Sequence, residues 1–252
     1  MSDRTKIVDS CRLLFSSWRK QRISGTTLTE LLTGIVIGGI VVTATASGFM
    51  NILRANQRVE SKTVRMAGLN KAINYLREDI KQARFITAEK AIAGGNCNPT
   101  AVSSEYCLVL TFADDTELRS GCSGVEPKIY YGYRDIRNGN QIWLKPGMLR
   151  RRIVCETGAG NWIAIADGLI SVNENNPADN QTPSEFCNQE GVNLTAPTAV
   201  YGGNSNGRGG FRFCLNNDSS TNRLVRIFLY GHIIGEEENP MQVNIATFSR
   251  SE

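Results

Sequence analysis

A twenty-residue run without a charged side chain constrains this sequence more than any other feature. It extends from Leu31 to Met50 and reads LLTGIVIGGIVVTATASGFM. As an α-helix it would rise about 30 Å, which is the thickness of the hydrocarbon core of a bilayer. No other stretch of this length lacks charge. The sequence therefore predicts one membrane-spanning helix near the N-terminus.

The charges around this run predict its orientation. Residues 1–25 contain six basic and two acidic side chains, and Arg19, Lys20 and Arg22 lie nearest to the run. Basic flanks stay in the cytoplasm, so the C-terminal part is expected on the other side of the membrane. The rest of the chain carries 22 basic and 22 acidic residues, and this balance gives no global argument for nucleic-acid binding.

One acidic residue, Glu30, lies at the start of the apolar run. A carboxylate costs about 2.5–3.5 kcal/mol at the centre of a bilayer and less near its interface. Such a group needs a partner, and no basic residue follows within one helical turn. The sequence therefore predicts that Glu30 finds its partner outside the chain.

The segment SGTTLTELLTGIVIGGIVV, which begins at Ser24, resembles the prepilin motif of type IV pilins and type II secretion pseudopilins. The resemblance implies that a prepilin peptidase in the membrane cleaves the basic leader, residues 1–25, after Gly25 and methylates the new N-terminal residue, Thr26. Glu30 would become the fifth residue of the mature chain. Its carboxylate would then pair with the α-amino group of a neighbouring subunit as the filament assembles.

Later segments resemble those of J-type pseudopilins and the related W-type minor pilins. In chain order they read NYLREDIKQAR, IYYGYR, LRRRIV, ADGLISVN and RLVRIFLYG. The resemblance implies a pilin-like minor subunit that primes or caps a type IV pilus or secretion pseudopilus, in adhesion, motility, secretion or DNA uptake. Its partners would be other pilins or pseudopilins, bound through the N-terminal helix, with the prepilin peptidase and the inner-membrane assembly platform. Its location would be a bacterial inner membrane, and then a filament or the cell surface.

Two other interpretations of the N-terminal region stay open. The first is a secretory signal peptide, because Ala44 and Ala46 form an A-x-A cleavage pattern. The second is a plain signal anchor. In either case the chain would be a secreted or signal-anchored, disulfide-bonded binding module. Neither interpretation assigns a role to Glu30.

Helical periodicity continues beyond the apolar run. Residues 51–86 contain no proline and one glycine, and their apolar side chains recur at spacings of seven, three and four. These side chains are Ile52, Val59, Met66, Leu69, Ile73, Leu76 and Ile80. The pattern predicts one helix from Thr27 to Phe85, about 88 Å long. Residues 26–50 form its membrane part and residues 51–87 its amphipathic part, which docks on the following domain or, alternatively, forms a parallel coiled coil.

The sequence predicts an extracytoplasmic, β-rich globular domain in residues 88–252. Strand-like runs alternate there with turn clusters rich in Gly, Asn and Pro. The runs are Tyr106–Ala113, Lys128–Arg134, Gln141–Lys145, Leu149–Cys155, Trp162–Ala166, Leu169–Asn173, Gly210–Leu215, Leu224–Ile233 and Met241–Phe248. Residues 174–209 are expected to form a long exposed loop. The predicted fold class is α+β and pilin-like, with the long N-terminal helix packed on a C-terminal antiparallel sheet.

The cysteines also indicate an exported domain. Cys11 lies in the leader, and six others lie in the β-rich part: Cys97, Cys107, Cys122, Cys155, Cys187 and Cys214. The sequence contains no CxxC pair, so a zinc site is not indicated. Six widely spaced cysteines favour up to three disulfides in an oxidising compartment, with free buried thiols as the alternative. Six cysteines allow 15 connectivities, and pairing in sequence order is the simplest.

No catalytic constellation is evident, so an enzyme, a cofactor and a metal site are not expected. His232 is the only histidine, and its apolar surroundings in the sequence favour a structural role. The run Arg150, Arg151 and Arg152 could contact DNA or another polyanion such as a polysaccharide, although a solvated strand face is the more common explanation of such a run.

Overall fold

The computed structural model describes residues 27–98, 100–113, 126–136, 144–155, 158–171, 181–188, 194, 199–203, 209–216, 222–233 and 240–249. The chain divides into two compact units, residues 1–56 and 57–252. The first unit contains the N-terminal part of helix α2, and the second contains the rest of that helix and every described strand. This organisation confirms the α+β class.

Helix α2 extends from Leu28 to Gln82, over 55 residues. The sequence predicted its start within one residue but placed its end too late, at Phe85. The structure instead forms strand β1 from Phe85 to Lys90. The Arg84 N–H donates to the Thr111 carbonyl at 2.7 Å, and Phe85 then pairs with Thr111. The helix ends because this distant strand supplies backbone partners that replace helical ones.

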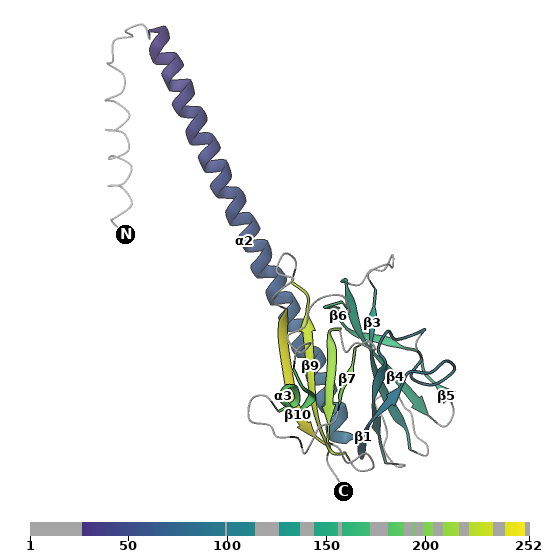
Figure 1. Ribbon diagram of the computed structural model, residues 1–252. Coiled ribbons are helices and arrows are strands. Elements are labelled where there is room, and N and C mark those ends of the chain that lie inside the picture. Colours follow the sequence, from purple (N-terminus) through teal and green to yellow (C-terminus); the bar gives the residue numbers. More distant parts are fainter. Residues whose placement is uncertain are drawn as a thin grey trace, which may run out of the picture. The chain divides into compact units, whose positions relative to one another are not determined.

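The strands form one antiparallel network in the second unit (Figure 1). Along its main path the order is β1, β2, β3, β4, β6, β9, β8 and β7, while β10 pairs with β9 and β5 pairs with β4. The Glu105 N–H, just before β2, donates to the Gly203 carbonyl, just after β7, at 2.7 Å. This contact brings the two parts of the sheet together, so the sheet is barrel-like. The remaining strands are β2 (Tyr106–Thr111), β3 (Lys128–Asp135), β4 (Gly147–Cys155), β5 (Gly158–Ala159), β6 (Ile163–Leu169), β7 (Val200–Gly202), β8 (Phe211–Leu215), β9 (Leu224–Gly231) and β10 (Met241–Phe248).

Several strand predictions need correction. The run predicted at 162–166 belongs to strand β6, which continues to Leu169. Of the run predicted at 169–173, Ile170 and Ser171 lie beyond the strand, and residues 172–173 lie outside the described part. The strand predicted at 141–145 is absent from its described residues, Leu144 and Lys145, and the others lie outside the described part. The predicted loop 174–209 contains strand β7 and a short helix, α3 (Pro183–Cys187). The side chain of Thr182 caps α3, and a five-residue helix is too short to show a periodic pattern.

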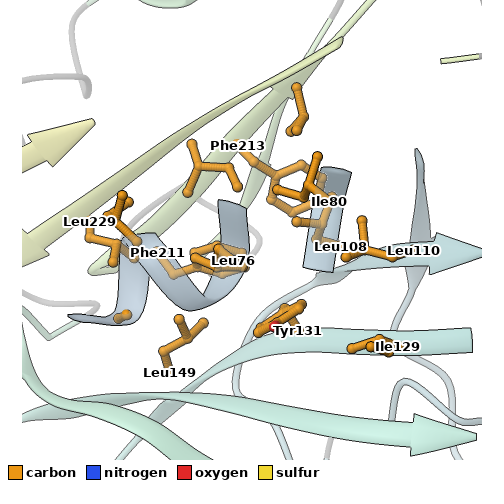
Figure 2. Packing of buried hydrophobic residues seen from close by; sticks show 14 of the residues in the cluster. Leu76, Ile80, Leu108, Leu110, Ile129, Tyr131, Leu149, Phe211, Phe213 and Leu229 are labelled. Atoms are coloured by element: carbon orange, nitrogen blue, oxygen red, sulfur yellow. The ribbon is translucent and has the colours of Figure 1, made fainter. Parts of the chain in front are cut away.

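The main core lies between the end of α2 and the sheet. Figure 2 shows Leu76 and Ile80 of the helix among side chains from several strands, including Phe211, Leu108 and Tyr131. The residues that α2 contributes to the core follow helical spacing and are Leu69, Ala72, Ile73, Leu76 and Ile80. Docking of the amphipathic part on the sheet is therefore confirmed for this segment. The earlier apolar positions of the same predicted stripe, Ile52, Val59 and Met66, stay exposed.

Candidate functional site: the N-terminal part of helix α2

Thr27 and Glu30 form a polar cap at the start of α2. The Thr27 N–H and the Thr27 hydroxyl both donate to Oε2 of Glu30, each at 3.1 Å. The Thr27 carbonyl accepts the first helical bonds, from the N–H groups of Glu30 and Leu31. This is the T-x-x-E spacing of a capping box, in which the acidic side chain satisfies a backbone donor at the helix start. Glu30 therefore accepts hydrogen bonds from inside the chain. Its pairing with a charged group outside the chain stays a prediction.

The hydroxyl groups within the apolar run are also hydrogen-bonded inside the helix. Thr33, Thr43, Thr45 and Ser47 each donate to the carbonyl four residues earlier, at 2.8–3.0 Å. Back-bonding of this kind hides a hydroxyl against its own helix. The four polar side chains consequently need no water, and the run remains suited to a hydrocarbon environment.

Every described side chain from residue 27 to residue 60 is exposed. The exposed set includes large apolar residues on all sides of the helix, among them Ile35, Val36, Ile37 and Ile40. By length and composition α2 is able to cross a membrane, as the sequence predicted, although a signal sequence would pass the same test. An apolar helix that the described residues leave uncovered is expected to be covered by lipid or by other protein.

Four glycines in this part of α2 have open space around them. A Cβ atom added at Gly34, Gly38, Gly39 or Gly48 would meet no atom within 4 Å, apart from the helix's own backbone. Packing among the described residues therefore does not require these glycines. Small residues four apart, such as Gly34 and Gly38, allow two helix backbones to approach closely in a membrane. Gly25 and Thr26, the predicted processing site, lie outside the described residues.

The arginine run on β4 is bound internally. Arg150 donates to the carbonyls of Ala101 and Trp162 at 2.7 and 3.0 Å, and Arg152 donates to those of Gly160 and Asn96 at 2.9 and 3.1 Å. Partial burial, and then the charge of nearby Arg134, lower the pKa of Arg150. Carbonyl partners do not neutralise a guanidinium charge, so polyanion contact by Arg150 and Arg152 remains a prediction.

The central arginine, Arg151, belongs to the core instead. Its Nε donates to Oδ2 of Asp79 on α2 at 2.8 Å, and both side chains are buried. The Tyr131 hydroxyl donates to the same oxygen, and Arg151 lies over the ring of Tyr75, 5.7 Å from its centroid. Burial, and then the Asp79 charge, raise the pKa of Tyr131 well above its ordinary value. Burial would lower the pKa of Arg151, but Tyr131 and Asp79 outweigh it and the pKa is raised.

Sequence reasoning missed this network, although a signal was present. Side chains alternate between the two faces of a strand, so Arg151 had to point away from Arg150 and Arg152. The acidic partner, Asp79, could not be identified because it is 72 residues away in the sequence.

The cysteines form disulfides, as their number indicated. Cys97 is bonded to Cys107, and Cys187 is bonded to Cys214. Both pairs join cysteines that are consecutive in the sequence. Cys155 is also disulfide-bonded, and its partner lies outside the described residues, as Cys122 does. A domain with these bonds is typical of an oxidising, non-cytoplasmic compartment.

The arrangement defines a class of protein: an α+β domain with disulfides, preceded by an apolar helix long enough to span a membrane. In the described part of the chain no group of three or more His, Cys, Asp and Glu side chains is arranged to hold a metal ion. Comparison with family models, curated proteins and solved structures finds no match to this chain.

Proposed function

We propose that this chain is a type IV pilin-like filament subunit, a minor pilin or pseudopilin that primes or caps a type IV pilus or secretion pseudopilus. The observation that carries the proposal is the exposed run of α2 from Leu31 to Met50, which is apolar on all sides and has Glu30 at its start. A monomer in a membrane needs only an apolar surface. A carboxylate at its N-terminal end and open glycines along it additionally fit a helix that packs against other helices.

The second unit supports the same proposal. The C-terminal segment of α2 packs on an antiparallel sheet through a regular apolar stripe. A helix packed on an antiparallel sheet is what the sequence resemblance leads us to expect. The stripe joins the helix to its domain, while the preceding part of the helix is left for other subunits. The proposed partners are other pilins or pseudopilins, the prepilin peptidase and the inner-membrane assembly platform.

The decisive experiment is N-terminal sequencing of the protein purified from membranes. The proposal expects a mature chain that begins at Thr26 and carries a methyl group on its α-amino nitrogen. A chain that begins at Ser47 would indicate a signal peptide and a secreted binding module. A chain that still begins at Met1 would indicate a signal anchor. Either result would overturn the proposal.

A second experiment tests the role of Glu30 in assembly. Glu30→Ala is expected to leave cleavage largely intact but to reduce incorporation into filaments, measured by immunoblotting of sheared filament fractions. Glu30→Gln separates two effects, because an amide oxygen still accepts from the Thr27 N–H but cannot pair as a charge with an α-amino group. Glu60→Ala, at an exposed position of the same helix, is the matched control. Full incorporation of Glu30→Gln would remove the charge-pairing argument.

A further inference from the structure

Strands β3 and β4 are neighbours in the sheet and bring two arginines onto one of its faces (Figure 1). Arg134 of β3 lies opposite Met148 of β4, and Gly132 lies opposite Arg150. Side chains that lie opposite each other, or two positions apart on one strand, share a face of the sheet. Arg134 and Arg150 are therefore diagonal neighbours, with Cα atoms roughly 7–8 Å apart, a distance that two long side chains can bridge.

The guanidinium groups of Arg134 and Arg150 act on each other. Both side chains are partly buried. Burial has the larger effect on the pKa of Arg150 and lowers it, and the charge of Arg134 lowers it further. Like charges at neighbouring cross-strand positions are destabilising, so the fold holds together two groups that repel each other.

The other two arginines of the run on β4 have acidic residues near them. Arg151 donates to Asp79 and is neutralised in the core. Arg152 lies opposite Tyr130, and the charges of Arg152 and Glu89 both act on this tyrosine. Arg150 differs from both, since its charged neighbour on β3 is another arginine.

The acidic residue opposite Met148 on the other side of β4 is Asp167, and it serves a different arginine. Its Oδ2 accepts from the Leu144 N–H at 2.9 Å. Burial lowers the pKa of Arg65 on α2, and the charge of Asp167 opposes this effect. Asp167 is thus engaged at the end of β6, beside Leu144 and Arg65.

Asp135 follows Arg134 directly, but adjacent side chains of a strand point to opposite faces. It also has an interaction partner of its own. None of the ion pairs formed by the described residues includes Arg134 or Arg150. The two positive charges are therefore balanced by no carboxylate in the part of the chain that the structure describes.

We propose that Arg134 and Arg150 together bind a dianionic oxyanion, either free phosphate or a phosphate monoester. Two adjacent guanidinium groups are neutralised by one group that carries about two negative charges, as phosphate does at pH 7. A carboxylate or a phosphodiester carries only one charge and would leave the pair half compensated. The planar guanidinium fork also matches the spacing of phosphate oxygens, and each phosphate has enough oxygens to accept from two forks.

The hydrogen bonds of Arg150 prepare it for this role. Its Nη1 donates to the Ala101 carbonyl and its Nη2 to the Trp162 carbonyl, which holds the guanidinium in place and leaves its other N–H groups for an anion. Arg134 donates to no described residue. One arm of the site is thus fixed, and the other is able to adjust to the ligand. The inference concerns the second unit alone and does not depend on the proposed filament function.

The test is the urea midpoint of the full chain in a nonionic detergent, with phosphate replacing chloride at constant ionic strength. The rise of the midpoint with phosphate gives the affinity. Arg134→Gln is expected to weaken this affinity about tenfold or more, because it removes charge-assisted hydrogen bonds. Lys128→Gln is the matched control, since it removes one charge from the same face of β3, roughly 20 Å from Arg134. Phosphate also stabilises proteins generally, and this effect is common to all three proteins.

A second comparison separates anion binding from a purely structural role. In chloride alone, Arg134→Gln relieves the repulsion, so its midpoint should equal or exceed that of the wild type. In phosphate its midpoint should fall below that of the wild type. A midpoint lower by the same amount in both salts would overturn the proposal, because Arg134 would then act only within the fold.

The remaining outcomes are distinct. A response to phosphate that Lys128→Gln retains and Arg134→Gln loses supports the proposal. Equal responses in all three proteins overturn it as a general salt effect, and equal losses in both variants overturn it as diffuse electrostatics. Glycerol 3-phosphate and dimethyl phosphate define the ligand. Binding of phosphate with or without glycerol 3-phosphate supports a free or an esterified dianion, respectively without and with the ester, whereas equally tight binding of dimethyl phosphate overturns the requirement for two charges.

Discussion

The two parts of helix α2 differ in where their partners come from. From residue 27 to residue 60 every side chain is exposed, although the segment is rich in Ile, Val and Leu. From Leu69 to Ile80 the apolar side chains are buried against the sheet. One continuous helix thus contains a segment that other described residues cover and a segment that they leave exposed. In this protein a segment can be helical without being buried against other described residues.

The composition of the two segments explains the difference. Over residues 31–50 the first segment is apolar on all sides, and its hydroxyls bond to its own carbonyls. Such a surface suits lipid or a bundle of helices. The second has one apolar face and charged residues elsewhere, which is what a single neighbouring sheet requires. The comparison teaches that the first segment is built for an external environment, and four sets of substitutions test this view.

The largest effect is expected for Asp79→Ala. The substitution leaves the Arg151 guanidinium buried without its carboxylate, and breaking a buried pair in this way costs about 3–5 kcal/mol. Urea unfolding of the full chain in detergent, followed by tryptophan fluorescence, measures the loss. Glu78→Ala, on the same turn but exposed, should cost less than about 0.5 kcal/mol. Similar losses for the two variants would show that Asp79 does not hold the helix to the sheet.

The disulfides should matter only to the second unit. Replacing both Cys187 and Cys214 by Ala removes a bond between residues 27 positions apart, and chain-entropy arguments give a loss of about 3.5 kcal/mol. The shorter Cys97–Cys107 loop, with a separation of 10, should cost about 2.7 kcal/mol. Urea unfolding measures both losses. Exchange of the amides of residues 31–50 should stay unchanged in each variant, and faster exchange there would contradict the separation of the two segments.

Matched truncations compare the two segments directly. Leu76→Ala opens a cavity in the main core and should reduce the stability of the second unit by about 3 kcal/mol. Ile40→Ala removes a side chain that is 63% exposed, and it should change the same free energy by less than about 0.5 kcal/mol. The expected effect of Ile40→Ala is instead on filament incorporation. Equal losses of stability would mean that the N-terminal part of α2 also has a partner in its own chain.

The smallest effect is expected at the helix cap. Thr27→Ala removes the hydroxyl that donates to Glu30, and loss of one such hydrogen bond costs about 1 kcal/mol of local helix stability, while the bond from the Thr27 N–H to Glu30 remains. Hydrogen exchange at residues 30–32 should become about fivefold faster, while the urea midpoint of the domain stays constant. Thr33→Ala, which also loses a hydroxyl bond but not a cap, should leave this exchange nearly unchanged. Equal acceleration in both variants would exclude a capping role.

Much of the fold was predictable because it depends on local patterns. The long helix follows from its uncharged run and the period of its apolar residues, and β10 was predicted with the bounds that it has. The prediction failed where local signals were weak or overruled. Strand β7 is three residues long, and the helical pattern up to Phe85 yields to pairing with Thr111. At the candidate site, the position of Glu30 was predictable, but its bond to Thr27 was not predicted.

The sequence by itself determined that this protein has an apolar helix able to span a membrane with a carboxylate at its start, and it indicated a β-rich part whose six cysteines favour disulfides. These properties are carried by neighbouring residues, whose spacing is visible without a structure. Only the tertiary structure decided that Arg151 enters the core beside Asp79, that the sheet curls into a barrel-like form, and that Arg134 lies beside Arg150 on one face of the sheet. Each of these depends on residues far apart in the chain, and their proximity exists only after folding.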